Sequence, residues 1–379
     1  MKKNPTPSVF LPLGLGLFLV LNATAQKPPE LGYVYPPAVT FGKTEVRLGG
    51  YDFTGDMQFF VHKEGIQLQV HGPPGPFLLP PPPYWFGEKG RLAALPIPRE
   101  IRATLTIPPD HPPGPVRWQV ANANGSSTTA LFYVSDIREV VESRYRTDPQ
   151  QLKSLPVGVS GRLSRISEID RYGFRATRSG PITVELFARS LGANFNGVIE
   201  VRNQSGKLVA DAADTEGTDT GLTFVAEAGQ NYRVHLHDVD FRGNRAFVYR
   251  LAIRPGPRVV ATLPAVGQRG TRREVEWIGL GLASGKPRLE SIRREIAFPG
   301  TGSPDTLDFL LETSFGTVPH RFPLDSQPQQ VRSDSLTPQR LSLPAGVSGR
   351  MKRAGAEFVW AAQKGKHYCL AARSQALGG

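Results

Sequence analysis

The chain has 379 residues, which is more than a single domain normally holds and enough for about three. Its 40 glycines and 35 prolines, about a fifth of all residues, disfavour long helices and favour short strands joined by turns, while 39% hydrophobic residues suffice for packed cores and argue against a disordered chain. A single cysteine excludes an internal disulfide framework and a cysteine-based zinc site.

The chain is basic, with a net charge of +12 that falls to +10 without the lysines at positions 2 and 3. The basic residues are scattered and alternate with acids, as at 272–274 and 293–295, where the sequence reads RRE each time. No basic helix and no known nucleic-acid module is recognisable in the sequence. The charge therefore predicts a soluble basic surface without a nucleic-acid partner, and attraction to anionic envelope polymers is the alternative.

Residues 1–25 have the features of a signal peptide. Lys2 and Lys3 form the positive start, an apolar stretch follows at 9–21, and the small residues ATA precede Gln26 as the new N-terminus. The apolar stretch is short for a membrane span, and no later segment is long and apolar enough to cross a membrane. We expect an exported protein of the periplasm, cell surface or exterior, without a span after leader cleavage; an uncleaved N-terminal anchor is the alternative.

Residues 33–134 predict one β-sandwich. Apolar and charged residues alternate over 42–50 (GKTEVRLGG), which is the period of a half-buried strand. A strand at 103–108 is stopped by a proline, and further strands at 116–120 and 130–134 are separated by Pro-Gly and Asn-Gly turns. The pattern is that of an all-β domain with little helix.

A proline-rich insertion interrupts this pattern at 72–98. Its proline density predicts an extended polyproline II path, and three adjacent aromatic residues, Tyr84, Trp85 and Phe86, lie in it. We predict these three as a ligand-binding platform for a sugar or a peptide partner. The alternative is that the insertion folds back and buries them against the sandwich.

The order of motifs in 33–134 resembles the immunoglobulin-like domains of the IPT/TIG family. The resemblance rests on LTIP at 105–108, PG at 113–114 and NGS at 124–126, each placed as in that family. It implies an immunoglobulin-like sandwich, in which the insertion is an elaboration.

An eight-residue passage occurs twice in the chain. LPVGVSGR at 155–162 returns as LPAGVSGR at 343–350, identical in seven of eight positions. A repeat at this distance indicates tandem modules. The polar residues 136–154 before the first copy are predicted as a linker or short helix. After it, alternating strands follow one another up to residue 254.

The first copy of the passage, together with the residues that follow it, resembles the bacterial pre-peptidase C-terminal domain. Residues 170–180 fit that family's Asp-x-Tyr-x-Phe-x-Ala-x-x-Gly signature with one extra turn residue before the glycine. The resemblance covers 155–254 and implies a jelly-roll-like β-sandwich, of a kind that often accompanies secreted proteases.

Residues 257–340 repeat the IPT/TIG-like opening, because 270–279 parallels 42–49. This second sandwich is 40 residues shorter than the first between equivalent points, and we attribute the missing length largely to the insertion and the linker. The fold class is thus all-β, with tandem β-sandwiches in which an immunoglobulin-like domain is followed by a jelly-roll-like one.

A second pre-peptidase-like copy is predicted at 343–379, where the family's aspartate is absent and the later strands are missing. We expect this truncated copy to pack poorly alone, and the complete gene product to be longer or this one truncated. A strand is predicted at 367–371, with Cys369 as a small buried hydrophobe.

The histidines are the first place to look for catalysis. None of the seven lies in a metalloprotease helix or a nucleophile-elbow setting, and phosphate-loop and dinucleotide fingerprints are absent from the sequence. His235 and His237 share one face of a predicted strand, either as metal ligands or as half-exposed strand residues. We therefore expect a protein that is not an enzyme.

Four acidic residues gather near a predicted hairpin: Asp211, Asp214, Glu216 and Asp219. Oxygen ligands on a short loop are what Ca²⁺ requires, although the spacing is not that of an EF-hand. A calcium site and a solvated hairpin are the two alternatives, and no other cofactor is expected.

The sequence as a whole favours a secreted, non-catalytic modular protein of the bacterial envelope or exterior, acting in binding, adhesion or scaffolding. Its partner would be an extracellular polysaccharide or protein. The alternative is the accessory substrate-binding portion of a larger secreted peptidase or other hydrolase whose catalytic domain is absent from this chain.

Overall fold

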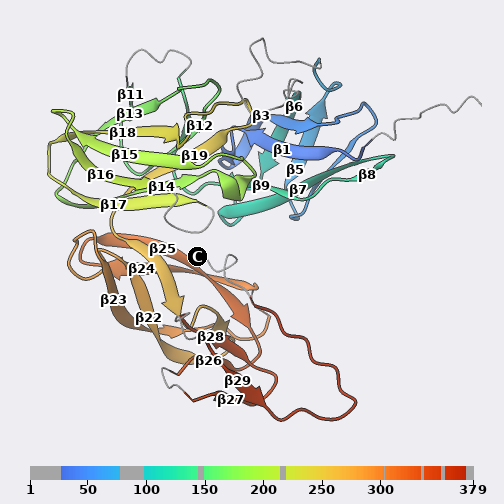
Figure 1. Cartoon of the computed structure of the whole chain (residues 1–379), viewed down its shortest axis with the longest axis vertical. Helices are drawn as coiled ribbons and strands as arrows, with labels where there is room; N and C mark the ends of the chain where they lie inside the picture. The colour runs from blue at the N-terminus through green and yellow to red at the C-terminus, as the bar shows by residue number, and fades with distance from the viewer. Residues whose placement is uncertain are drawn as a thin grey trace, which may run out of the picture.

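The computed structural model describes residues 27–76, 98–143, 149–213, 219–302, 304–333, 337–350 and 355–372. In these ranges the regular structure is β, apart from one 3₁₀ turn at Arg189–Leu191, which confirms the all-β class. Figure 1 shows several sheets stacked one after another along the chain. Within the same ranges, no helix is long and apolar enough to cross a membrane.

Two sheets share one core in the first unit. Its strands are β1 (Glu30–Tyr35), β2 (Ala38–Val39), β3 (Gly42–Tyr51), β4 (Gln58–Val61), β5 (Gln67–His71), β6 (Arg99–Ile107), β7 (Gly114–Asn122), β8 (Gly125–Ser126) and β9 (Ala130–Val134). The strand orders are β1-β3-β6-β5 and β2-β9-β7-β4. The predicted alternation holds on β3, because Val46 and Leu48 are buried in the same core as Trp118.

A second pair of sheets follows. Its strands are β10 (Glu139–Val141), β11 (Gln150–Gln151), β12 (Val157–Arg162), β13 (Asp170–Arg175), β14 (Gly180–Phe187), β15 (Gly197–Asn203), β16 (Leu208–Ala213), β17 (Thr220–Ala226), β18 (Asn231–Asp238) and β19 (Val248–Pro255). The orders are β10-β12-β19-β14-β17 and β11-β13-β18-β15-β16. The segment predicted as a linker or short helix, 136–154, therefore contributes a parallel edge strand to each sheet, and its described residues contain no helix.

The third unit is smaller. Its strands are β20 (Arg258–Leu263), β21 (Gly267–Gln268), β22 (Arg272–Leu280), β23 (Leu289–Ala297), β24 (Thr306–Thr313) and β25 (Gly316–Asp325). They form sheets β20-β22-β23 and β21-β25-β24 around Trp277. Only residues 281–288 connect β22 to β23, whereas 52–98 connect β3 to β6. The missing length is thus the β4–β5 hairpin and the insertion; attributing part of it to the linker was wrong.

The second copy of the repeated passage reproduces the pairing of the first. Strands β26 (Gln329–Val331) and β28 (Gly346–Ser348) pair in parallel, as β10 and β12 do, and β27 (Gln339–Leu341) and β29 (Phe358–Trp360) pair as β11 and β13 do. Cis peptide bonds precede Pro156 and Pro344 in the two copies of the passage, and Pro36 and Pro264 at equivalent places in the first and third units.

The last described residues differ from expectation. Residues 361–372 form no strand, and Cys369 is exposed, so the predicted strand and the buried thiol are both wrong. The physical reason is that no described strand lies beside this segment to receive its backbone hydrogen bonds and cover its side chains. Leu370 accordingly keeps 74% of its surface in solvent.

The third unit is joined to the second by a short and firmly held connection. Gly256 donates its N–H to the carbonyl of Pro181 at 2.8 Å, and its own carbonyl accepts from Thr183 Oγ1 at 3.0 Å. Arg258 Nε donates to Glu185 Oε1 at 3.1 Å across the same junction. In Figure 1 the third unit lies below the pair formed by the first two.

Candidate functional site

The repeated passage is explained by what its residues touch. A Cβ on Gly158 would lie 2.1 Å from Glu139 Oε1, and a Cβ on Gly346 would lie 2.3 Å from Gln329 Oε1. Both glycines therefore leave room for a side chain from the preceding edge strand. Because β10 and β26 lie against the motif in this way, the same residue type is needed in both copies.

A buried ion pair holds the first of these edge strands in place. Arg250 on β19 donates from Nη2 to Glu139 Oε1 at 2.7 Å and from Nε to the same oxygen at 3.0 Å. The two side chains are 1% and 9% exposed. The guanidinium also lies over the Tyr133 ring at 4.4 Å, which ties the end of the first unit to the second.

The Asp-x-Tyr signature forms a buried chain of hydroxyl groups. Tyr249 donates to Asp170 Oδ2, and the Tyr172 and Tyr249 hydroxyls are hydrogen-bonded to each other. Burial, followed by the charges of Tyr172 and Asp170, raises the pKa of Tyr249 well above its ordinary value. In the second copy the equivalent positions are Ala356 and Phe358, so both polar partners are replaced together.

The last residue of the motif, Arg162, joins the first unit to the second. Its guanidinium lies 3.6 Å from the centre of the Tyr35 ring, and Nη1 donates to Glu100 Oε1 at 3.1 Å. Tyr33 Oη donates to the same oxygen at 2.7 Å, and Arg47 Nη1 donates to Glu100 Oε2 at 3.1 Å. We call Arg162, Glu100 and Tyr35 the latch.

The latch keeps its carboxylate ionised. Burial alone would raise the pKa of Glu100, but the hydrogen bond from Tyr33 and the positive charge of Arg162 outweigh burial, and the net effect lowers that pKa. Burial would lower the pKa of Arg162, yet the neighbouring Tyr33 and Glu100 raise it overall. The pair is therefore charged at neutral pH, with each side chain less than 15% exposed.

The second copy contains the same arginine with a different acid. Arg350 Nη2 donates to Glu276 Oε1 at 3.0 Å. Glu276 lies opposite Leu263 in the third unit, just as Arg47 lies opposite Tyr35 in the first. The acid of the second copy therefore occupies the position of Arg47 and not that of Glu100. The arginine of the contact is thus repeated, while its acid comes from a different strand position.

A cleft opens beside the latch. One part, of about 700 Å³, and a second part, of about 420 Å³, adjoin each other, because Arg47, Glu100 and Arg245 line both. The other residues that line it are Tyr35, His71, Pro73, Gly75, Pro76, Ile101, Arg102, Val141, Glu142, Arg162, Ser164, Arg165 and Glu168.

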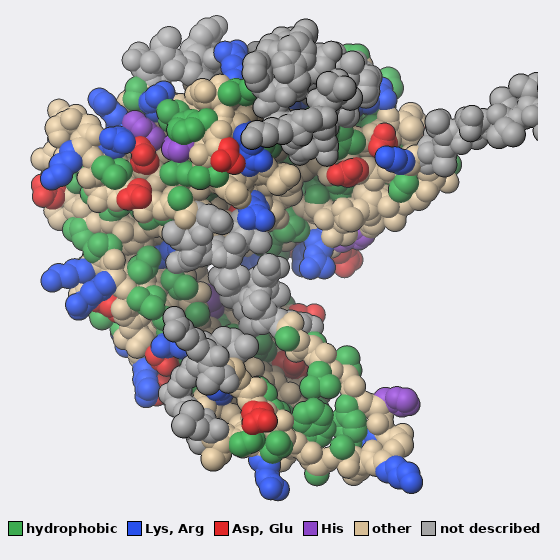
Figure 2. Space-filling view, in the orientation of Figure 1, with side chains coloured by type: hydrophobic (Ala, Val, Ile, Leu, Met, Phe, Trp, Pro, Cys, Tyr) green, Lys and Arg blue, Asp and Glu red, His purple; other side chains and the backbone are tan. Residues whose placement is uncertain are grey.

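The polar groups of the cleft differ in their hydrogen bonding. Glu142 accepts from Tyr35 Oη at 3.1 Å and from the Arg162 N–H at 3.0 Å, and Glu168 Oε2 accepts from the Arg165 N–H at 2.7 Å. With Glu100 held by the latch, all three carboxylates of the cleft already have donors. On the face of the molecule shown in Figure 2, basic and acidic side chains are interspersed.

The predicted aromatic platform, Tyr84, Trp85 and Phe86, lies outside the described residues and stays a prediction. The described ends of the insertion do meet the cleft. Pro76 lines it, and the carbonyl of Pro98 accepts from Arg245 Nη1 at 3.5 Å.

The root of the insertion is fixed by Arg99, which donates to the carbonyls of Gly75, Phe53 and Pro74 at 2.6–3.1 Å. Both ends of the insertion are therefore held at the rim of the cleft. Sequence reasoning missed the cleft because its arginines are far apart in the chain; the repeated arginine at the end of the motif was the available signal.

The predicted calcium ligands are only partly described. Asp214 and Glu216 lie outside the described residues, and Asp211 is exposed on β16. Asp219 Oδ1 accepts from the N–H groups of Ala188 at 2.9 Å and Ser190 at 3.2 Å, so it caps the 3₁₀ turn.

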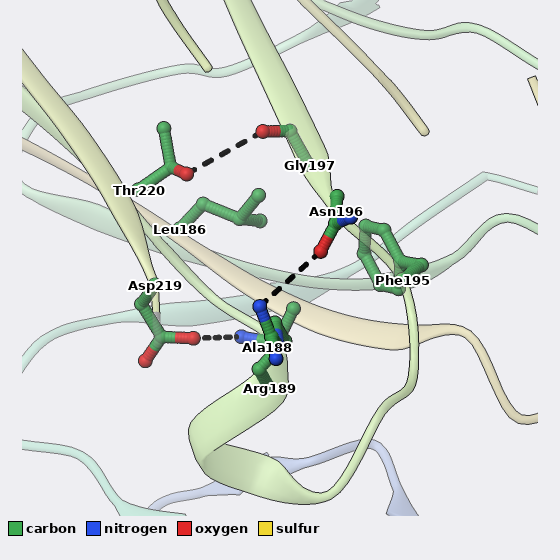
Figure 3. Close-up of a pocket in the computed structure, with 8 residues that line it drawn as sticks. All are labelled: Leu186, Ala188, Arg189, Phe195, Asn196, Gly197, Asp219 and Thr220. Atoms are coloured by element: carbon green, nitrogen blue, oxygen red, sulfur yellow. Dashed lines mark hydrogen bonds between the residues drawn. The ribbon is translucent and has the colours of Figure 1, made fainter. Parts of the chain in front are cut away.

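Figure 3 shows Asp219 and Arg189 among the residues that line a small cavity. The cavity has a volume of about 10 Å³, which is room for about one water. Thr220 donates across this cavity to the Gly197 carbonyl at 3.4 Å, and Arg189 to Asn196 Oδ1 at 3.4 Å. One capped carboxylate beside a guanidinium is a poor donor set for a cation. The calcium site stays a prediction for the acidic loop itself.

The two strand histidines do share a face of β18. His235 Nδ1 lies 3.9 Å from Glu200 Oε2, and burial, aided by the charges of Arg171 and Arg202, lowers the pKa of His235. His237 stacks on the Phe241 ring with 4.5 Å between ring centres. Among the described residues no group of three or more metal-ligating side chains is found.

Comparisons with known proteins give structural likeness only. No protein-family model matches the chain, and a search of curated protein sequences gives no match. The pre-peptidase C-terminal domain of a collagenase from Bacillus anthracis is 16% identical, with 30% of this chain and all of that chain covered at a TM-score of 0.25.

Two further solved structures are similar over longer stretches. The secreted serine protease VesC from Vibrio cholerae is 9% identical at a TM-score of 0.21, with 57% of this chain and 48% of that chain covered. SGBP-B from a xyloglucan utilization locus of Bacteroides uniformis is 11% identical at a TM-score of 0.19, with 60% of this chain and 73% of that chain covered.

Proposed function

We propose that the protein is an exported, non-catalytic modular binding protein of the bacterial envelope or exterior, and that its ligand occupies the cleft beside the latch. In this proposal the first and third units are immunoglobulin-like domains of the IPT/TIG type. The second unit, and the segment that begins at residue 343, are pre-peptidase C-terminal-like domains.

The observation that carries the proposal is a large cleft built across two units that are locked together. The latch buries Arg162 between Tyr35 and Glu100, so the two walls of the cleft keep a fixed relation. A preformed site loses less conformational entropy on binding than a site that must assemble. At about 700 Å³, the larger part alone is of the size that ligand sites commonly have.

The hydrogen bonding of His71, which lines the cleft, supports a binding role. His71 Nε2 lies 2.7 Å from Thr104 Oγ1, and that hydroxyl donates to Glu45 Oε1 at 2.7 Å. In nucleophilic catalysis the histidine lies between the acid and the hydroxyl and takes the hydroxyl proton. Here the hydroxyl lies between the other two and gives its proton to the glutamate, which supports a role without catalysis.

The test is a blocking substitution in the cleft. Ser164 is exposed and lines the cleft, so Ser164→Trp should fill it and leave the latch intact. Ser291→Trp, at an exposed position on β23 of the third unit, is the matched control. The mature chain and both variants are screened by affinity electrophoresis and biolayer interferometry against polysaccharides and secreted proteins.

We expect at least one ligand whose binding is lost in Ser164→Trp and kept in Ser291→Trp. Binding that is equal in both variants would place the ligand elsewhere. Turnover of any polymer by the purified chain would contradict the non-catalytic assignment.

A further inference from the structure

We propose that the ligand of the cleft is an acidic polysaccharide, whose anionic groups are bound by Arg102, Arg165 and Arg245 together with the exposed face of Arg47. This inference rests on the proposed function and adds the chemical class of the ligand.

The first argument is the unused hydrogen-bonding capacity of the cleft. Its carboxylates, Glu100, Glu142 and Glu168, all accept from protein donors. Among the described residues, Arg102 and Arg165 have no side-chain partner, and Arg245 has only the Pro98 carbonyl at 3.5 Å. What the cleft offers a ligand is therefore mainly guanidinium N–H donors, which an anionic oxygen fits best.

The second argument is charge. Five arginines and three glutamates line the cleft, which leaves an excess of two positive charges. An isolated exposed arginine is normally solvated, but the arginines of the cleft converge on it from separate elements. Arg47 lies on β3 and Arg102 on β6, Arg165 follows β12, and Arg245 precedes β19. Convergence raises the local potential and favours an anion with more than one charge.

The third argument separates a glycan from an acidic peptide. Peptide recognition relies on apolar side chains that fill pockets, and the exposed apolar side chains of this cleft are Val141 and two prolines. An acidic polysaccharide carries charged groups repeatedly along its length and needs no apolar anchor. Such a chain is long enough to contact both adjoining parts of the cleft, with Arg165 in one, Arg102 in the other and Arg245 in both.

The experiment measures binding of four polymers to the full mature chain: polygalacturonate, dextran sulfate, neutral dextran and poly-glutamate. The cleft variant is Arg165→Gln with Arg245→Gln. The matched control is Arg272→Gln with Arg293→Gln, two arginines of the third unit that are 68% and 67% exposed and pair only with surface glutamates. Both double variants lose two positive charges, so a difference between them reports position and not net charge.

We expect polygalacturonate, dextran sulfate or both to bind, with affinity reduced tenfold or more in the cleft variant and at most twofold in the control. Which of the two polymers binds identifies carboxylate or sulfate as the anionic group. Affinity should fall as salt rises.

Three results would overturn the inference. Equal loss in both double variants would indicate general charge attraction. Poly-glutamate as the sole ligand would assign the cleft to acidic peptides. Neutral dextran bound as tightly as the acidic polymers, and lost in Ser164→Trp, would refute the anionic ligand while leaving the proposed function intact. If no ligand depends on the cleft in either this set or the wider screen, both proposals fail.

Discussion

Ser160 and Ser348 occupy the same place in the two copies of the repeated passage, yet their hydroxyls have different surroundings. Ser348 Oγ accepts the N–H of Ala265 at 3.0 Å. In the first copy the residue equivalent to Ala265 is Pro37, which has no N–H, and Ser160 Oγ is buried with no hydrogen-bond partner in the described structure. One proline thus leaves a buried polar atom unsatisfied.

This difference predicts opposite outcomes for one substitution. Ser348→Ala removes the acceptor of the Ala265 N–H and should lower the free energy of unfolding of the third unit by about 1–2 kcal/mol. Ser160→Ala removes only an unsatisfied hydroxyl and should be neutral or stabilising. Chemical denaturation, with hydrogen exchange at the Ala265 amide, measures both. A larger loss in Ser160→Ala than in Ser348→Ala would contradict this account.

His320 makes the stability of the third unit depend on pH. Its ring packs against Trp277 and Phe322, and burial lowers the pKa of His320 to about 4 from 6.5. Between pH 6.5 and pH 4, His320 is therefore protonated in the unfolded chain and neutral in the folded unit. Stability is complete above pH 6.5 and should decrease by about 3 kcal/mol as pH falls to 4.

His320→Phe should remove this loss, because a phenyl ring has no titratable nitrogen. Hydrogen exchange on β22 at pH 7.5 and pH 5 checks the prediction in both chains. An unchanged pH dependence in the variant would assign it to other groups.

At the scale of elements, the ion pair of the latch and the equivalent ion pair of the second copy differ in burial and should differ in strength. Arg162 and Glu100 are 14% and 13% exposed, whereas Arg350 and Glu276 are 57% and 26% exposed. Arg162→Gln removes the buried cation beside Glu100 and leaves only the half-exposed Arg47 as its ion-pair partner, so it should cost about 3 kcal/mol. Arg350→Gln should cost under about 1 kcal/mol, because an exposed pair is screened by water.

Urea unfolding of the full chain gives both values, and Glu100→Gln in the Arg162→Gln background should restore part of the loss. Equal costs for the two arginine substitutions would show that burial does not decide the strength of the contact.

The edges of β12 and β28 also lead to different expectations. β12 is paired on both sides, by β10 and β19, while β28 pairs only with β26 in the described chain. A strand held along one edge opens more readily, so amides of β28 should exchange about tenfold or more faster than those of β12. Mass spectrometry of exchanged peptides that cover 157–162 and 346–348 makes the comparison. Equal protection would indicate that another segment covers β28.

Some elements could be predicted from the sequence and others could not. β3 was predictable because apolar residues alternate along it, and β13 because its signature is specific. β10 and β11 were missed because they are short and polar and exist only through pairing with distant strands. The cleft was missed for the same kind of reason: Arg47, Arg102 and Arg245 meet only after two units have folded and docked.

At the scale of the whole molecule, Gly256 determines how the third unit leaves the second. Its φ of +127° is a conformation that other residues rarely adopt, while a Cβ there would meet nothing closer than the Phe315 carbonyl at 3.8 Å. Gly256→Ala should therefore strain the backbone by about 1–3 kcal/mol without a steric clash.

We expect this strain to lower the melting temperature and to change the radius of gyration seen by small-angle X-ray scattering. Gly300→Ala, in an open loop of the third unit, is the control and should change neither. An unaltered scattering curve for Gly256→Ala would show that Arg258 and Glu185 hold the junction by themselves.

The edge strands β10 and β11 have a consequence for how such chains can be rearranged by recombination. A crossover at the start of the repeated passage would separate each module from the two edge strands that pair with its sheets. A crossover upstream of residue 136 would carry them along. The same two edge strands recur as β26 and β27, so a duplication that preserved this pairing had to include them. The segment that recombination must transfer as one piece therefore begins upstream of the repeated passage.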